Sequence, residues 1–200
     1  MLAAYLEDAR RQFRGLKHHA EKALAQVSDE DFFAQIDPGS NSIAILVKHV
    51  AGNLRSRWTD FLTSDGEKAD RQRDSEFELE PGDTRASLME RWEEGWRRLF
   101  GAVDPLEPDD LSRTVQIRAE PHSVLKAMNR QLTHYAGHVG QIVLLAKHAT
   151  GERWQTLSVP RGASEDFNRK MREKGPSEGG GVGRTAGKPA PPGSPSGPNR

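Results

Sequence analysis

The chain has 200 residues, with 29 basic and 29 acidic side chains, seven histidines and no cysteine. Because these charges balance, the chain has no overall field to attract nucleic acid or acidic lipid, and neither is an expected partner. The lack of cysteine excludes disulfides, zinc ribbons and a thiol nucleophile within the chain.

The longest apolar runs, such as residues 43–47 and 142–146, are far shorter than the roughly 18 residues that a membrane-spanning helix needs. The N-terminus also lacks a basic stretch followed by an apolar one, so we expect a cytoplasmic protein without a secretory signal. We predict one packed domain over residues 1–174. Glycine and proline dominate residues 175–200, which predicts a disordered tail.

Apolar residues recur at threes and fours over residues 2–27, which predicts a first long helix with one buried face. His18 and His19 lie in this helix, but adjacent side chains point about 100° apart, so we expect a solvated pair rather than a shared ion. Ser28 is a predicted N-cap for a short helix that ends before Asp37.

The second long helix is predicted from a cap at Asn41 or Ser42 to about residue 64. His49 lies at the flank of its apolar stripe, with Asn53 one turn later. Residues 64–83 are polar, highly charged and without period, so we expect a long loop. Such a loop either covers an active-site mouth or is a solvated crossover, and both readings remain open.

The third long helix is predicted to start at Asp83 or Thr84 and to end before Pro105. It carries Trp92 and Trp96 at helical spacing, which is typical of a core or a subunit interface. Residues 112–119 alternate as in a short strand, which must pack on the helices or pair across a dimer. A short last helix is predicted from about residue 164.

The fourth long helix is predicted from Pro121 to Gly151, and it carries His134 and His138 four residues apart. Side chains at this spacing differ by about 40° around the axis, so both imidazoles leave one side of the helix and can bind one ion. Solvated or hydrogen-bonded histidines are the alternative. His148 lies in the last turn, where a positive charge suits the helix dipole.

Packing of the second helix beside the fourth brings His49 within reach of His134 and His138. Three imidazoles with open coordination positions form the catalytic type of zinc site, and imidazole also suits nickel, copper and iron. No carboxylate stands at ligand spacing beside these histidines, so the motif does not indicate a general base.

Polar neighbours of the histidines are candidates for supporting roles. Asn53 and Gln141 each lie about one turn from a histidine and can orient a water or a substrate carbonyl, or satisfy ring and backbone groups. Arg57, Arg118 and Arg130 are candidates for binding a substrate carboxylate, with simple surface charge as the alternative.

Two stretches carry a family resemblance: NSIAILVKHVAGNLRSRWTDFLTSDGEK around His49, and LTHYAGHVGQIVLLAKHATGERWQTLSVPRG around His134 and His138. Together with four helices and a long crossover, they resemble the DinB-like (DinB/YfiT) superfamily of metalloenzymes, in a branch made of a domain of unknown function. The resemblance covers about residues 1–170.

This resemblance implies an all-α fold, a four-helix bundle with up-down-down-up connectivity and a long crossover between the second and third helices. It also implies a homodimer that holds one divalent metal, Zn²⁺ or Ni²⁺, by His49, His134 and His138. Relatives include S-transferases and isomerases that use a low-molecular-weight thiol as cosubstrate.

Two functions are therefore expected as alternatives. The first is a metal-dependent enzyme acting on a small molecule, either a thiol S-transferase or a hydrolase, because the ion can activate a thiol or a water. The second is a non-catalytic helical bundle with a structural metal and a role in stress or protein interaction. The sequence does not decide whether the protein is an enzyme.

Overall fold

The computed structural model describes residues 1–174, and these residues are mostly helical. They belong to two compact units, one of residues Met1–Leu157 and one that begins at Ser158. The predicted helical class is confirmed at this level, with a small two-stranded sheet in addition. The predicted tail, residues 175–200, lies outside the described residues, and the predicted domain limit at residue 174 stays a prediction.

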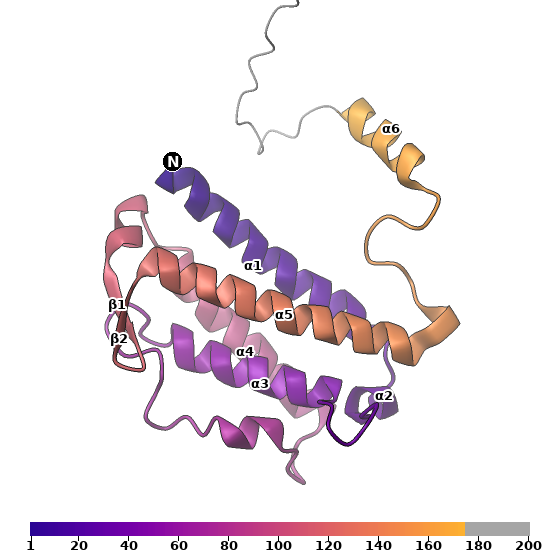
Figure 1. Cartoon of the computed structure of the whole chain (residues 1–200), viewed down its shortest axis with the longest axis horizontal. Coiled ribbons are helices and arrows are strands. Elements are labelled where there is room, and N and C mark those ends of the chain that lie inside the picture. The colour runs from indigo at the N-terminus through magenta and orange to yellow at the C-terminus, as the bar shows by residue number, and fades with distance from the viewer. Residues whose placement is uncertain (175–200) are drawn as a thin grey trace, which may run out of the picture. The chain divides into compact units, whose positions relative to one another are not determined.

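Most of the first unit consists of four long helices, which are α1 (Leu2–Leu24), α3 (Ile43–Trp58), α4 (Arg85–Val103) and α5 (Val124–Thr150) (Figure 1). The shorter elements between and after them are α2 (Asp29–Phe33), the 3-10 helices η1 (Asp74–Phe77), η2 (Pro108–Ser112) and η3 (Gly151–Arg153), and the strands β1 (Thr114–Ile117) and β2 (Glu120–Ser123). The second unit contains α6 (Ser164–Lys174), at the predicted position.

Side-chain caps fix the starts of four of these helices. The hydroxyls of Ser28, Ser42, Thr84 and Ser123 accept hydrogen bonds from backbone N–H groups three residues later. The helix α3 ends at Trp58, earlier than the apolar pattern predicts. The reason is local, because Asp60 has a φ of 49°, in the left-handed region that a continuing helix cannot use.

A β-hairpin replaces the predicted first turn of the fourth helix. Pro121 and His122 pair with β1, opposite Gln116 and Val115, so the prediction of a helix from Pro121 was wrong. The helix starts at Val124 instead, after its cap Ser123. The strand therefore finds its partner within the chain rather than across a dimer.

An acidic side chain from a distant segment holds the turn of this hairpin. Arg118 and Ala119 have φ values of 57° and 59°. Their N–H groups donate to the two carboxylate oxygens of Asp65 at 2.8 and 2.7 Å. These charge-assisted bonds stabilise a left-handed backbone that residues other than glycine rarely adopt.

Contacts between helix ends give the direction of each long helix. The Tyr5 hydroxyl donates to Asn129 at 2.8 Å, so α1 and α5 start together and run parallel. Arg85, at the start of α4, donates to the carbonyl of Leu24 at the end of α1, so these two helices are antiparallel. The pairs Lys48–Asp83 and Thr59–Arg98 show that α3 runs parallel to α4. Consequently α3 and α5 are antiparallel neighbours (Figure 1).

The core lies between the four long helices and is rich in aromatic rings. Trp92 and Trp96 are fully buried, so these tryptophans belong to the core of the chain and not to an exposed interface. The ring of Trp96 lies 5.7 Å from that of Tyr135, which ties α4 to α5. The largest fully buried side chains also include Phe13, Phe32, Leu6, Ile43, Leu46, Leu54, Leu88, Leu99 and Leu111.

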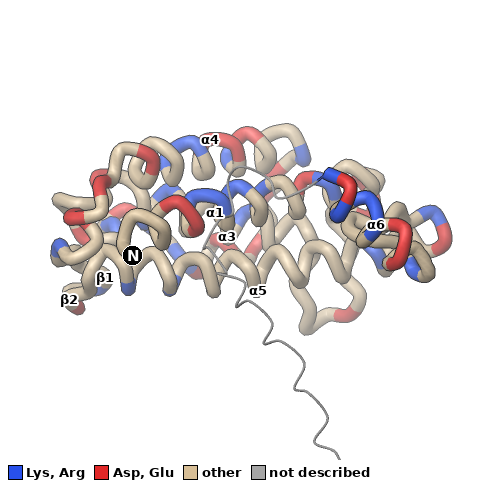
Figure 2. The backbone as a smooth tube through the Cα atoms, turned by 90° about the horizontal axis from the view of Figure 1, so that it is seen from above, with Lys and Arg blue, Asp and Glu red and all other residues tan. Residues whose placement is uncertain are grey.

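Charges of both signs alternate over α1 and α4, so neither helix presents a surface of a single sign (Figure 2). In contrast, α5 carries Lys126, Arg130 and Lys147 and no acidic residue. Within the described residues, no helix combines the length and the apolar character needed to cross a membrane.

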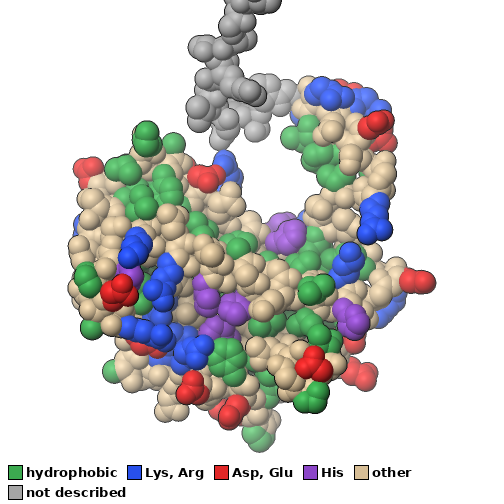
Figure 3. Space-filling view, viewed as in Figure 1, with side chains coloured by type: hydrophobic (Ala, Val, Ile, Leu, Met, Phe, Trp, Pro, Cys, Tyr) green, Lys and Arg blue, Asp and Glu red, His purple; other side chains and the backbone are tan. Residues whose placement is uncertain are grey.

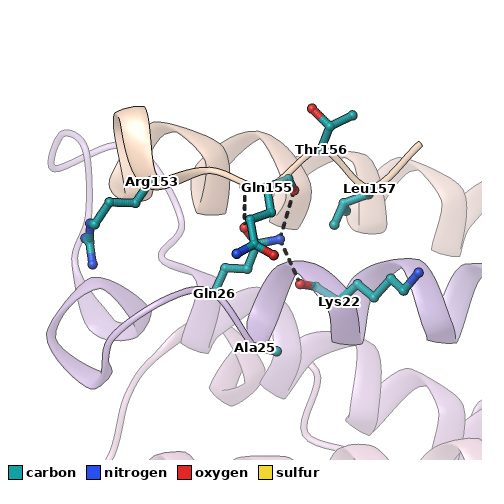
Figure 4. Close-up of a pocket in the computed structure, with 7 residues that line it drawn as sticks. All are labelled: Lys22, Ala25, Gln26, Arg153, Gln155, Thr156 and Leu157. Carbon is teal, nitrogen blue, oxygen red and sulfur yellow. Dashed lines mark hydrogen bonds between the residues drawn. The ribbon is translucent and has the colours of Figure 1, made fainter. Parts of the chain in front are cut away.

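A polar groove of about 480 Å³ lies between the end of α1 and the residues that follow η3 (Figure 4). Gln26 spans it, because its side chain accepts from the backbone N–H of Gln155 at 2.7 Å and donates to the carbonyl of Gln155 at 3.1 Å. These bonds fasten the end of α1 to the chain after α5. None of the residues predicted to form a site lines this groove.

The close approach of α3 and α4 predicts the effect of one substitution. A Cβ at Gly95 would lie 2.8 Å from the Cβ of Leu54 and 3.3 Å from the carbonyl of Ala51, so the helices must separate. We expect Gly95→Ala to destabilise the fold by about 1–2 kcal/mol, because overpacking outweighs the gain in helix propensity. Urea unfolding measures this change.

Gly101→Ala, in the same helix, is the matched control, because nothing lies within 4 Å of its added methyl group. This variant should gain up to about 1 kcal/mol. Equal effects of the two substitutions would contradict the tight contact between α3 and α4.

Candidate metal centre

Three histidine nitrogens converge where α3 crosses α5. The Nε2 atom of His134 lies 3.3 Å from Nε2 of His49 and 3.1 Å from Nε2 of His138. One nitrogen from each of the three rings lies within 4.8 Å of the other two. The two turns of α5 and the turn of α3 thus offer three donor atoms to one point.

Local structure explains why these rings meet. His134 and His138 are one turn apart on α5 and leave the same side. A buried chain of hydrogen bonds presses α3 against this side: Trp58 donates to the hydroxyl of Tyr135 at 3.0 Å, which donates to Asn53 at 3.0 Å. Because Asn53 lies one turn after His49, this chain fixes the height of His49 relative to the pair on α5.

The spacing of the nitrogens suits a small divalent ion. Bonds of 2.0–2.1 Å in a tetrahedral arrangement place two ligand nitrogens about 3.3 Å apart, close to the two measured separations. The structure therefore contains a group of three histidines that could hold a metal ion. Actual binding of an ion by His49, His134 and His138 stays a prediction.

Hydrogen bonds at the outer nitrogens leave the converging nitrogens free for coordination. Nδ1 of His49 lies 2.8 Å from Oε2 of Glu76, and Nδ1 of His138 lies 2.8 Å from Oε1 of Gln141. Both oxygens can accept a hydrogen bond, and a ring that donates from Nδ1 keeps the lone pair of Nε2. The orientation is that of a metal-binding histidine.

The rings of α5 are disposed to stay neutral. Burial is the largest cause that lowers the pKa of His134 to about 3, and repulsion by His138 and His49 when they are protonated, and by Arg57, adds to it. Burial also lowers the pKa of His138, although its hydrogen bond to Gln141 opposes this shift. Neutral imidazole is the form that binds a metal, so protons compete weakly with an ion at these two rings.

The carboxylate of Glu76, which lies beside Nδ1 of His49, instead favours its charged form. Burial alone would raise the pKa of Glu76, but hydrogen bonds from His49 and Arg71 and the charge of Arg71 bring it below its ordinary value. Glu76 is therefore an anion at neutral pH, and it can only accept hydrogen bonds.

The predicted supporting residues lie in different places. Gln141 contacts His138, whereas the side-chain oxygen of Asn53 is used by Tyr135 in the core. Arg57 is buried, and its terminal nitrogens are taken by the carbonyl of Gly66 and the carboxylate of Glu67. Arg130 is exposed on α5, which agrees with the alternative that it is a simple surface charge.

The other predicted arginine also points away from a free role. The backbone N–H of Arg118 donates to Asp65, and its Nε donates to Glu67 at 3.2 Å. Its guanidinium is thus engaged in the contact between the hairpin and the loop after α3.

The residues that sequence reasoning missed come from the crossover segment, which we define as residues 59–84. Its 3-10 helix η1 supplies Glu76 and also Phe77, whose ring lies 4.6 Å from that of His49. Glu76 is 27 residues from His49 and follows no local spacing. The length and charge of this loop were the available signal, and they identified the segment but not the residue.

The site reaches the surface of the protein. His49 is 3% exposed, while His134 and His138 are half-buried. Figure 3 shows histidine side chains gathered near the middle of one face of the first unit, with basic side chains beside them. Two of the three histidines thus reach the surface of the protein.

The fold and the histidine cluster define a mostly helical protein with a candidate three-histidine metal centre. The model of a family described as a protein of unknown function (DUF1572) matches residues 1–163. The chain belongs to this family. No curated protein matches the chain.

The lowered pKa values predict how acid affects the metal-free protein. An unfolded histidine takes up a proton near pH 6.5, whereas folded His134 resists protonation until about pH 3. The unfolded state thus binds more protons between these values, and stability falls as the pH decreases below about 6.5. We expect His134→Gln to reduce this loss between pH 6.5 and 5, measured by urea unfolding with a chelator.

His148→Gln is the control, because His148 is exposed near the end of α5. It should keep the acid sensitivity of the unmodified protein. An identical loss in all three proteins would show that His134 takes up its proton as readily as an exposed histidine.

Proposed function

We propose that this protein is a metal-dependent enzyme whose centre is formed by His49, His134 and His138 and holds a divalent ion, Zn²⁺ or Ni²⁺. Its reaction is of the thiol S-transferase type or a hydrolysis, and its substrate is a small molecule. The observation that carries the proposal is the convergence of three Nε2 atoms at separations of 3.1 and 3.3 Å around one point.

The proposal includes membership of the DinB-like superfamily and a four-helix bundle with up-down-down-up connectivity. Support comes from the parallel pairs α1/α5 and α3/α4, which run in opposite directions, and from the long crossover between α3 and α4. A homodimer is proposed because the resemblance to this superfamily implies one. Nucleic acid and membranes are not proposed partners.

The histidines leave room for a reacting group. Three neutral ligands fill three positions of a divalent ion, and a catalytic site keeps at least one more open. A bound ion supplies Lewis acidity and lowers the pKa of a water or thiol that it binds. Since the chain has no cysteine, a thiol nucleophile must be a small-molecule cosubstrate.

Side chains around the cluster have separate tasks in this proposal. Gln141 and Glu76 hold the rings of His138 and His49 at their outer nitrogens, which orients Nε2 toward the reaction point. The ring of Phe77 covers His49 and limits the access of water to that side. Arg130, exposed on the helix that carries two ligands, stays a candidate for binding a substrate carboxylate.

Metal analysis tests the first part of the proposal. Untagged protein should contain about one divalent ion per chain, and His138→Ala should lose most of it, because two imidazoles bind far more weakly than three. His148→Ala, on the same helix and outside the cluster, should keep the ion. A metal content unaffected by His138→Ala would refute the site.

A specific observation also favours a second function, a bundle with a structural ion. Glu76 and Phe77 enclose His49, and a closed coordination sphere would leave no position for a substrate. Cobalt-substituted protein distinguishes the two functions. We expect its visible spectrum to change on addition of a small thiol, as an open position requires. A spectrum that thiols leave unchanged favours the structural role.

A further inference from the structure

The crossover segment brings a buried acid to the outer side of the histidine cluster. Oε2 of Glu76 accepts from Nδ1 of His49 at 2.8 Å, on the ring edge opposite the converging nitrogen. The side chains of His49 and Glu76 are 4% and 9% exposed, so water competes little for this bond.

A second buried side chain holds this acid in place. Arg71 donates from Nε to Oε1 and from a terminal nitrogen to Oε2 of Glu76, both at 2.8 Å. The fork is bidentate, which fixes the plane of the carboxylate as well as its position. Arg71 is itself 3% exposed and contacts Glu67, so the pair belongs to a buried network of the crossover segment.

The helix under this acid is shaped to receive it. Gly52 lies on α3 three residues after His49, and a Cβ there would be 2.3 Å from Oε1 and 2.7 Å from Cδ of Glu76. Any other residue at this position would displace the carboxylate. The absence of a side chain at residue 52 therefore lets Glu76 lie against the helix and reach His49 in the preceding turn.

We propose that Glu76 is a positioning residue of the metal centre, which keeps the proton of His49 on Nδ1 and so keeps Nε2 available as a ligand, with Arg71 and Gly52 holding it in place. This inference rests on the proposed function for its biological meaning. Its physical content, the position of a proton on His49, can be measured without any metal.

An amide cannot replace the carboxylate in this arrangement. The two oxygens of Glu76 accept three hydrogen bonds, one at Oε1 and two at Oε2. In Glu76→Gln, one of these positions becomes an NH₂ group that faces a donor, either of Arg71 alone or of Arg71 and His49. If the NH₂ group turns to His49, it favours a proton on Nε2, the nitrogen that must bind the ion.

Nitrogen NMR of metal-free protein at neutral pH tests the proposal, with the His49 signals assigned by comparison with His49→Gln. The unmodified protein should show His49 protonated on Nδ1, and Glu76→Gln should shift this population toward Nε2. Glu78→Gln is the matched control: it removes the same charge two residues later, from an exposed side chain that accepts no hydrogen bond from the described residues. It should keep the Nδ1 form.

Zinc affinity, measured by competition with a chelator, adds a second readout. We expect Glu76→Gln to bind Zn²⁺ about 10–100-fold more weakly than the unmodified protein, and Glu78→Gln to match the unmodified protein. Unchanged protonation of His49 in both Glu76→Gln and Gly52→Ala would overturn the positioning role. Failure of all proteins to bind metal, with the proton shift intact, would instead overturn the proposed function alone.

Gly52→Ala approaches the same contact from the other side and keeps every charge. It should shift the proton of His49 as Glu76→Gln does, because the new methyl group expels the carboxylate. Gly101→Ala is its control, with nothing within 4 Å of the added methyl group. If Glu76→Gln fails to fold, as circular dichroism would show, Gly52→Ala decides the question, and an unchanged Nδ1 form in that variant overturns the proposal.

Discussion

The hydrogen-bond chain from Trp58 through Tyr135 to Asn53 is the constraint on which the site depends. It lies in the core, where an unpaired polar atom costs about 1–3 kcal/mol, so all three groups must stay in register. Because it joins α3 to α5, it also sets the height at which His49 meets the helix of His134 and His138. The geometry of the three histidines therefore depends on how the core packs.

The local features of the site and of the helices can be predicted from the amino-acid sequence. The spacing of His134 and His138 gives their common direction, and the serine and threonine caps give the starts of helices to within a residue or two. The meeting of His49 with the pair required an assumption about which helices are neighbours. Side-by-side packing of the second and fourth helices in a bundle was that assumption, and the resemblance to a known superfamily agreed with it. The structure places the three rings together.

Other parts depend on contacts that sequence periodicity does not encode. The fourth helix was predicted from Pro121, yet Pro121 and His122 form a strand because β1 offers them a partner and Asp65 stabilises the turn. Glu76 was missed for a similar reason. Its position is set by Gly52 and Arg71. The need for a glycine at residue 52 becomes visible only in the structure, where the carboxylate of Glu76 occupies the space that a side chain would take.

In the proposed centre, the buried charges of the crossover segment would serve to orient His49 rather than to stabilise the fold. Replacement of a buried ion pair by apolar residues is often neutral or stabilising, so Arg71 and Glu76 are weak candidates for holding the fold together. What such a pair supplies is orientation, because a bidentate fork permits few geometries. The loop after α3 carries this pair to the side of His49.

Distance along the chain between the ligands has a consequence for folding. His134 and His138 are neighbours in any helical fragment, whereas His49 is separated from them by 85 residues or more. Before the chain folds, a cation can therefore bind at most two ligands, His134 and His138, and only weakly. In the proposed centre, the complete set of three ligands would form only after these non-local contacts, and a bound ion would then favour the folded state by mass action. A bound divalent ion would accordingly stabilise the contact between α3 and α5, which lie far apart in the sequence.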